Sequence, residues 1–318
     1  MSRPTARELR LFSDLAYSDL LTEYYIKEGR KRLISYDGFS DKYHDKIDKT
    51  YPKPDNNGLH VNFHILFSNW ILFDTVQNLI KITKIKDNPL LDGFVFKSAF
   101  DDIFVIAFRG TNPKNRKQRK QDMIQNLSLF LADRDPNTQL GQAEVLVKLV
   151  IKSCLGLNPH QPSNSISDLS EKIFVTGHSK GGGLAQSITC ILREEFEIKV
   201  KGVTFSATPI YLFPSQLKKP SKDWDCENYI LASDRVLSGL SFFRFLKFRR
   251  LLKSHLKKNK IKQPKNLRLR NLKKLWNLTK QSSSGYVGGI TKTFDPQPDF
   301  LKHSLEHYDK YFNHDGSL

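Results

Sequence analysis

Apolar residues recur along this chain with helical spacing in some segments and as short continuous runs in others, and the two patterns alternate several times. A helical spacing of three or four residues predicts helices over 6–30, 63–84, 122–132, 142–155, about 181–196 and about 300–312. Short apolar runs predict a hairpin of 94–100 and 103–108, and further strands at 173–176, 200–205, 229–232 and just after the glycine-rich turn at 285–289. A polar, turn-rich stretch over 36–60 predicts an exposed loop.

The alternation of strands and helices predicts an α/β protein whose central sheet is mostly parallel and carries helices on both faces. The chain has 318 residues, of which 39% are hydrophobic and 22 are phenylalanine, as expected of a globular protein. No internal repeat is visible. We therefore expect a single domain over 1–318, interrupted by a basic insertion at about 238–282.

One segment combines a strand, a Gly-x-Ser-x-Gly turn and the start of a helix: residues 173–185, with the turn at Gly177-His178-Ser179-Lys180-Gly181. An α/β-hydrolase holds its nucleophilic serine in this context, at a sharp bend between a strand and a helix. The bend strains the serine backbone, and side chains at 177 and 181 are expected to collide with the neighbouring strand and helix. We predict that Ser179 is a nucleophile.

A serine nucleophile needs hydrogen-bond donors for the oxyanion that forms on its substrate. The amide of Lys180, the residue after the serine, is the first expected donor. Thr111 is the second, through its amide or hydroxyl, because it follows the strand ending at Phe108 where such a loop belongs. We interpret Arg109 as part of a structural ion pair beneath the turn rather than as a catalytic group.

The serine also needs a base and an acid that orients the base, and in α/β-hydrolases these follow the serine in the order acid, then histidine. Asp234 is the favoured acid because it ends an apolar strand, although a solvent-facing turn residue is the alternative. His303 is the favoured base, since it begins the terminal helix beside the last strand. His307, one turn deeper, remains the alternative base, and metal binding by this histidine pair lacks a third ligand.

These residues together resemble the class 3 lipases, the fungal-type triacylglycerol lipase family, and related bacterial lipase-like proteins. The resemblance rests on the segments 15–18 (LAYS), 106–111 (IAFRGT), 176–182 (TGHSKGG), 233–236 (SDRV) and 303–308 (HSLEHY), and it spans roughly 10–234 and 285–312. It implies an α/β-hydrolase fold, a triad of Ser179, Asp234 and His303, and an oxyanion contact from the Thr111 backbone. It also implies hydrolysis of lipid carboxylic esters without a metal or other cofactor.

The net charge of +18 is concentrated in one part of the chain. Between Arg235 and Lys292 there are 17 lysines and arginines and no acidic residue, which leaves 34 basic and 33 acidic residues elsewhere. Within this segment, residues 242–253 mix bulky apolar and cationic side chains, as an interfacial helix on an anionic membrane does. The expected membrane-binding residues are Phe242, Arg244, Phe245, Lys247, Arg249 and Arg250.

Other interpretations of the basic segment stay open. A solvated insertion is one, and binding of nucleic-acid phosphates is another, although aromatic residues become sparse after Phe248. A second basic cluster at 114–120 follows the expected oxyanion loop, where lids of the family commonly lie, so both clusters are expected to flank one mouth. The cations favour a charged lipid over neutral triglyceride as the substrate.

No run of 18 uncharged apolar residues predicts a transmembrane helix, and the first residues lack the apolar core of a secretory signal. Cys154, Cys190 and Cys226 have neither metal-type spacing nor a disulfide framework, so we expect free thiols. A cytoplasmic or peripheral-membrane location is expected, and export without a cleaved signal stays open.

The sequence thus favours a lipid acyl-hydrolase of phospholipase A or lysophospholipase type, acting on a lipid ester at an anionic membrane surface. A soluble carboxylesterase of small esters is one alternative. An inactive hydrolase fold that binds membranes or nucleic acid is the other.

Overall fold

A computed structural model gives the fold of the chain and describes residues 3–17, 69–76, 79, 91–111, 129, 134–155, 169–208, 225–231 and 290–294. The side chains of 153–155, 231 and 290–294 lie outside that description. In the described part of the chain, no helix is both long enough and apolar enough to cross a membrane.

A sheet of seven strands forms the centre, and its strands lie side by side in the order in which they occur along the chain. The strands are β1 (Trp70–Thr75), β2 (Gly93–Ser98), β3 (Phe104–Phe108), β4 (Ile173–His178), β5 (Lys201–Phe205), β6 (Cys226–Leu231) and β7 (Ile290–Phe294). Strands β1, β2 and β3 are antiparallel neighbours, whereas β3 to β7 run parallel. The α/β class with a mostly parallel sheet, expected from the sequence, is therefore present.

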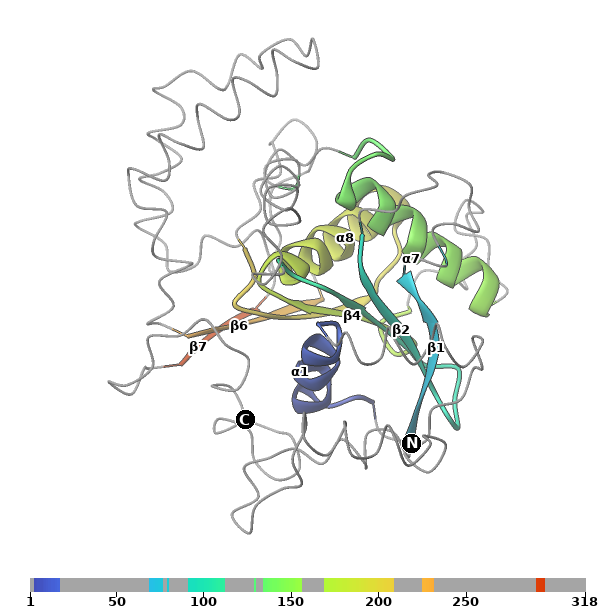
Figure 1. The fold of residues 1–318 in the computed structure, drawn as a ribbon, viewed down its shortest axis with the longest axis horizontal. Coiled ribbons are helices and arrows are strands. Elements are labelled where there is room, and N and C mark those ends of the chain that lie inside the picture. Colours follow the sequence, from blue (N-terminus) through green and yellow to red (C-terminus); the bar gives the residue numbers. More distant parts are fainter. Residues whose placement is uncertain are drawn as a thin grey trace.

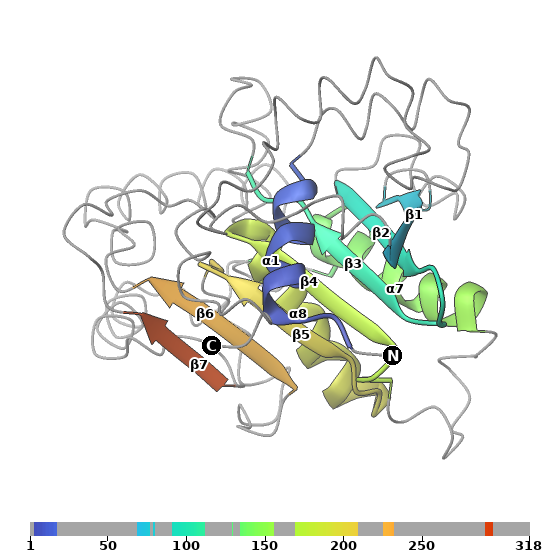
Figure 2. The ribbon, with the colours of Figure 1, turned by 90° about the horizontal axis from the view of Figure 1, so that it is seen from below.

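Helices cover both faces of this sheet (Figures 1 and 2). Helices α7 (Gln139–Leu155) and α8 (Lys180–Phe196) lie on one face, and α1 (Ala6–Leu15) lies on the other. The strand order explains this division, because right-handed crossovers between successive parallel neighbours deliver their helices to the same face. The opposite face needs another cover, and α1 supplies it by packing mainly against β4.

Burial on both faces explains the composition of the central strands. Every residue of β3 and β4 is buried, so these strands read as nearly continuous apolar runs. On one face, residues of α7 such as Leu146 and Val150 join one apolar core with Ile106 and Val175 of the central strands. On the other face, Phe12 of α1 contacts the Phe96 ring at a centroid distance of 4.6 Å.

One element differs from its prediction. The spacing over 63–84 predicted a helix, but Trp70–Thr75 is the edge strand β1, antiparallel to β2. Its side chains alternate between buried and half-buried, which is the period of a strand with one face packed. A short apolar run bounded by polar residues is compatible with a helix or a strand, and hydrogen-bonded pairing with β2 selects the strand.

Most other predicted elements occur within a few residues of their expected ends. The β2–β3 hairpin and β4 to β7 are present, as are the 142–155 and 181–196 helices, observed as α7 and α8. The helix predicted over 6–30 is present from Ala6 to Leu15, and residues 18–30 lie outside the described part. The predicted loop at 36–60, most of the 122–132 helix, the terminal helix and the basic insertion also lie outside it.

Candidate active site

Ser179 occupies the turn between β4 and α8 with a backbone that side-chain-bearing residues rarely adopt. Its φ is 56° and its ψ is −123°, a conformation that costs about 1–3 kcal/mol for a non-glycine residue. Backbone hydrogen bonds hold it there: its N–H donates to the Phe205 carbonyl at 3.1 Å, and its carbonyl accepts from Gly183 and Thr208 at 3.0 and 2.9 Å. The turn is therefore fixed by both neighbouring elements.

The two glycines of the motif are required by close packing. A Cβ on Gly177 would lie 2.4 Å from the Gly181 carbonyl carbon, and a Cβ on Gly181 would lie 2.1 Å from the Phe108 carbonyl oxygen. Neither contact is possible for real atoms, so the helix start approaches β4 and β3 as closely as it does only because both side chains are absent. This agrees with the steric reason that the sequence predicts.

Helix α8 begins directly after the serine turn, at Lys180. Ser179 is the residue before the helix, yet its hydroxyl makes no capping hydrogen bond to the helix amides. The first amides of a helix carry partial positive charge and suit an anion. The Lys180 amide, expected to bind the oxyanion, is the first of them, and Ser179 itself is half-buried.

The segment leading to Thr111 lies against this turn. A Cβ on Gly110 would be 2.7 Å from the His178 carbonyl oxygen, so the loop after β3 touches the residue that precedes the serine. Thr111 follows directly and is half-buried. The structure thus brings the two expected oxyanion segments to the carboxyl ends of adjacent parallel strands, since Phe108 is paired with Gly177.

Arg109 forms the structural ion pair expected from the sequence, and the partner is Asp92. The Arg109 Nη1 donates to Asp92 Oδ2 at 3.1 Å, and the Arg109 amide donates to the Asp92 carbonyl at 2.9 Å. Burial raises the pKa of the Asp92 carboxyl, while the positive charges of Arg109 and Lys180 act in the opposite direction. No motif in the sequence points to Asp92, although the hairpin pairing of Gly93 with Phe108 places it opposite Arg109.

Helix α1 supports the nucleophile strand from the other face through side-chain hydrogen bonds. The Ser13 hydroxyl lies 2.8 Å from the Thr176 hydroxyl, and the Tyr17 hydroxyl lies 3.3 Å from His178 Nδ1. Tyr17 lies two residues past the end of α1, four residues beyond Ser13, and His178 lies two residues beyond Thr176 on β4, so the two contacts follow one another along the strand. Tyr17 lies in the segment that carries the family resemblance, but its contact with His178 was not predicted.

Several expected site residues lie outside the described residues. These are the predicted acid Asp234, the base His303 with its alternative His307, the basic cluster at 114–120, and the membrane-binding residues Phe242, Arg244, Phe245, Lys247, Arg249 and Arg250. Their roles stay predictions. Ser179, Lys180 and Thr111 are the expected site residues that the structure describes.

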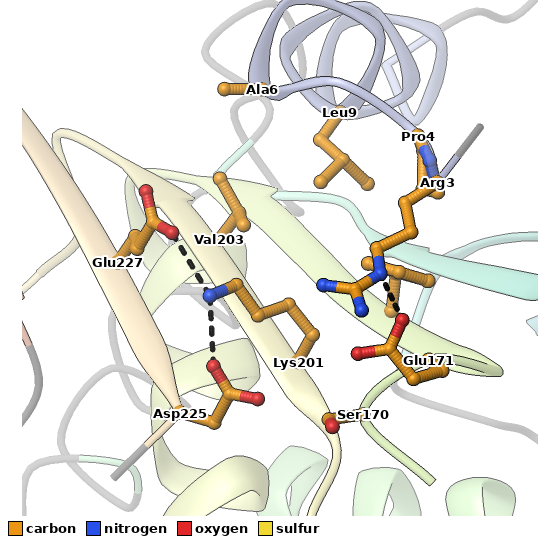
Figure 3. Close-up of a pocket in the computed structure, with 11 residues that line it drawn as sticks. Arg3, Pro4, Ala6, Leu9, Ser170, Glu171, Lys201, Val203, Asp225 and Glu227 are labelled. Atoms are coloured by element: carbon orange, nitrogen blue, oxygen red, sulfur yellow. Dashed lines mark hydrogen bonds and ion pairs between the residues drawn. The ribbon is translucent and has the colours of Figure 1, made fainter. Parts of the chain in front are cut away.

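A charged cavity of about 290 Å³ opens at the other end of the strands (Figure 3). Lys201, the first residue of β5, contacts Asp225 at 2.8 Å and Glu227 at 2.9 Å, and Arg3 pairs with Glu171. These residues lie at the amino ends of the parallel strands, whereas Ser179 follows the carboxyl end of β4. Ligand sites of such sheets form at the carboxyl ends, so this cavity is separate from the candidate active site.

Cys190 of α8 and Cys226 of β6 are buried free thiols. Burial raises the pKa of the Cys226 thiol to about 12 and that of Cys190 well above its usual range. Neutral thiols of this kind pack as small apolar groups and are poor nucleophiles. The side chain of Cys154 lies outside the described residues.

Neither a protein-family model nor a curated protein sequence matches this chain. Among solved structures, the Lip2 lipase from Yarrowia lipolytica is similar over 64% of this chain and 76% of its own, with 16% identity and a TM-score of 0.34. The extracellular lipase LipA from Serratia marcescens is similar over 74% of this chain and 42% of its own, with 14% identity and a TM-score of 0.35. At these scores neither similarity assigns a function, so a functional assignment depends on the local geometry of the site.

Proposed function

We propose that this protein is a serine hydrolase of lipid esters, of the phospholipase A or lysophospholipase type, built on an α/β-hydrolase fold. The observation that carries the proposal is the backbone of Ser179, a non-glycine residue with φ of 56° between a buried parallel strand and a helix. Strain of this kind persists where the surrounding structure imposes it, and it concentrates at functional sites. Nucleophilic serines of this fold class occupy such a turn.

The proposed reaction is a two-step acyl transfer. The Ser179 hydroxyl attacks the ester carbonyl, and His303 accepts the hydroxyl proton and returns it to the departing alcohol. Asp234 orients the imidazole and stabilises its charged form, while the amides of Lys180 and Thr111 hold the oxyanion. A water molecule then attacks the acyl-enzyme with His303 again as base, which releases the fatty acid and regenerates the serine.

The membrane part of the proposal rests on the localised charge. The segment from Arg235 to Lys292 carries 17 cationic residues and no acidic one. Each lysine or arginine close to an anionic bilayer contributes about 1 kcal/mol of binding, so half of these cations would hold the enzyme at the surface. The interleaved phenylalanines and leucines at 242–253 supply apolar side chains for the interface.

Labelling with a fluorophosphonate probe tests the nucleophile, because the probe modifies only an activated serine. We expect labelling of the purified wild-type protein at Ser179 and hydrolysis of a short-chain nitrophenyl ester, and we expect Ser179→Ala to abolish both. Ser170→Ala is the matched control, since Ser170 lines the cavity at the amino ends of the parallel strands, away from Ser179. An unlabelled wild-type protein would indicate an inactive fold, and unchanged ester hydrolysis by Ser179→Ala would refute the assignment.

Vesicle sedimentation tests whether the protein binds anionic membranes. It compares binding to phosphatidylglycerol vesicles with binding to phosphatidylcholine vesicles. We expect binding and phospholipid hydrolysis on the anionic vesicles at about 0.05 M salt, with most binding lost at about 0.5 M salt because the charges are screened. A mass-spectrometric survey of the released lipids then identifies the bond that is cut. Equal weak binding to both vesicles, with rapid nitrophenyl ester hydrolysis, would indicate a soluble carboxylesterase instead.

A further inference from the structure

The loop that follows β5 holds Ser179 by both of its backbone polar groups. The Ser179 N–H donates to the Phe205 carbonyl at 3.1 Å, and the Ser179 carbonyl accepts from the Thr208 N–H at 2.9 Å. Phe205 ends β5 and Thr208 follows it by three residues, so one short loop bonds the nucleophile from both sides. Ser206, inside this loop, has a φ of 42°, which is uncommon for a non-glycine residue. Two strained residues thus lie in segments that are hydrogen-bonded to each other.

Thr208 bonds the Ser179 carbonyl twice. Besides its N–H, its hydroxyl donates to the same oxygen, at 3.3 Å. The Gly183 amide donates to this oxygen as well, at 3.0 Å, as the first backbone hydrogen bond of α8. A carbonyl oxygen has two lone pairs, so three donors saturate it and leave it little freedom to change direction.

Close packing brings Thr208 to this position. A Cβ on Gly183 would lie 2.7 Å from Thr208 Oγ1, and a Cβ on Gly182 would lie 2.8 Å from the Ala207 Cβ. The loop after β5 therefore approaches the first turn of α8 as closely as it does because neither helix residue has a side chain. Both glycines lie beyond the Gly-x-Ser-x-Gly motif, so the motif does not account for them.

The Ser179 carbonyl shares a peptide group with the amide that is expected to bind the oxyanion. This carbonyl and the Lys180 N–H belong to one planar, trans peptide, in which the two groups point in opposite directions. Any contact that fixes the carbonyl therefore also fixes the direction of the N–H. Hydrogen bonds accepted by a carbonyl also polarise its peptide group, which strengthens the N–H as a donor.

We propose that Thr208 is a positioning residue, which aligns and strengthens the Lys180 amide as an oxyanion donor by bonding the opposite end of the same peptide group. The inference rests on the proposed serine hydrolysis and adds a residue to its oxyanion site. An interaction that acts only on the developing oxyanion lowers kcat and kcat/KM equally when it is lost, and it leaves KM unchanged.

Thr208→Val removes the hydroxyl and keeps both the N–H and the shape of the side chain. We expect kcat for a nitrophenyl ester to fall about threefold to tenfold with unchanged KM, because one hydrogen bond to the Ser179 carbonyl is lost. The fall should be smaller than the about hundredfold loss that follows removal of a whole oxyanion donor, because the Lys180 amide remains. Thr208→Ser keeps a hydroxyl and should recover most of the lost kcat.

A thionoester substrate separates alignment of the oxyanion donor from general support of the serine. Its carbonyl oxygen is replaced by sulfur, a weak hydrogen-bond acceptor, so its hydrolysis depends less on the Lys180 amide. The kcat/KM of the ester divided by the kcat/KM of the matching thionoester should therefore fall in Thr208→Val. A variant that only disturbs the Ser179 side chain would slow both substrates equally and leave this ratio unchanged.

Gly183→Ala tests the same contact from the helix side. The added methyl group lies 2.7 Å from Thr208 Oγ1, so the hydroxyl has to move, while the higher helix propensity of alanine offsets part of the crowding. We expect a lower ester-to-thionoester ratio in a protein that remains folded by circular dichroism. Thr189→Val is the matched control, since the Thr189 hydroxyl donates to the Ala185 carbonyl further along α8. It should keep the wild-type kcat and ratio.

Three outcomes overturn the inference: Thr208→Val with wild-type kcat, a fall in kcat that leaves the ratio unchanged, or Thr208→Ser as impaired as Thr208→Val. If Thr208→Val does not fold, the ratio in Gly183→Ala decides, and an unchanged ratio rejects the inference. Failure of the proposed function is distinguishable, because it appears as an inactive wild-type protein or as hydrolysis that persists in Ser179→Ala, and either result rejects both. A wild-type rate in Thr208→Val with no rate in Ser179→Ala rejects this inference alone.

Discussion

The Tyr17 hydroxyl lies 3.3 Å from His178 Nδ1 and 3.4 Å from the His178 carbonyl oxygen, across the sheet face opposite the nucleophile helix. A Cβ on Gly110 would come within 1.9 Å of the same hydroxyl. One side chain just past the end of α1 thus touches the residue before Ser179 and the loop that leads to Thr111. The nucleophile turn is therefore supported, from the sheet face opposite α8, by a residue more than 150 positions earlier in the chain.

Tyr17→Phe removes the hydroxyl and keeps the ring. We expect the free energy of unfolding to fall by about 1 kcal/mol, the usual contribution of such a hydrogen bond, and kcat for a nitrophenyl ester to fall several-fold. Ser13→Ala is the comparison, because Ser13 bonds Thr176, two residues further from the turn. It should lose similar stability in urea denaturation but keep the wild-type kcat. Equal effects of both variants on kcat would contradict a specific role for Tyr17.

Gly181→Ala places a methyl group 2.1 Å from the Phe108 carbonyl oxygen, a backbone atom, so β3 or the start of α8 has to shift. Overpacking of a tight interior costs about 1–3 kcal/mol or more, so the thermal midpoint should fall clearly. Displacement of α8 would also misalign the Lys180 amide, and fluorophosphonate labelling of Ser179 should be lost in the folded fraction. A variant with wild-type melting and labelling would show that this packing is looser than the structure indicates.

Glu197→Gly should act in the opposite direction, at the other end of the same helix. Glu197 ends α8 with φ of 56° and ψ of 21°, the left-handed conformation that glycine adopts without penalty. Its side chain is exposed, so little packing is lost. We expect a gain of about 0.5–1 kcal/mol in urea denaturation, and none for Glu197→Ala. A loss of stability in the glycine variant would indicate that the Glu197 side chain has an unrecognised contact.

Alkaline pH should destabilise the fold through the buried Cys226 thiol. Its pKa is raised to about 12 in the folded protein, compared with about 8.5 for an unfolded chain. A pKa raised on folding gives stability that is complete below the unfolded value and is lost as pH rises toward the folded value. Between about pH 8.5 and pH 10 this loss amounts to about 2 kcal/mol.

Urea denaturation at about pH 8 and about pH 10 measures this loss. The wild-type protein should lose about 2 kcal/mol more between the two pH values than Cys226→Ala does. The Cys190 thiol has a raised pKa for the same reason and continues to titrate in the variant, so some pH dependence should remain. Identical losses in both proteins would show that Cys226 is accessible enough to ionise while folded.

Local patterns predicted those parts of the fold that chain-neighbouring residues determine. The β2–β3 hairpin and the β4–α8 turn each depend on a continuous segment, and both occur where the sequence places them. β1 was mistaken for part of a helix because Trp70–Thr75 is short and apolar, and only pairing with β2 selects the strand. Tertiary contact overrides local preference in such cases.

The features of the candidate site also differ in whether local sequence or tertiary contact determines them. The nucleophile turn and the glycines that it requires follow from the motif, and Asp92 could have been found by extending the hairpin pairing one step beyond Gly93 and Phe108. The burial of Lys180 could not, because it depends on how closely β3 lies against the start of α8. The assignments of Asp234 and His303 rest on chain order and on their positions beside a predicted strand end and helix start.

The position of α1 has a consequence for synthesis of the chain on the ribosome. Helix α1 is made before every strand of the sheet, and its capping box of Thr5 and Glu8 favours early helix formation. Its apolar residues include Leu9, Leu11, Phe12 and Leu15. Its main docking surface, β4, emerges more than 150 residues later. Until β4 is made, the apolar residues of α1 lack their main packing partner, and exposed apolar surface of this kind favours association between incomplete chains. Trp70 and Phe96, which contact Phe12 in the folded protein, are made before β4 and can cover part of this surface first.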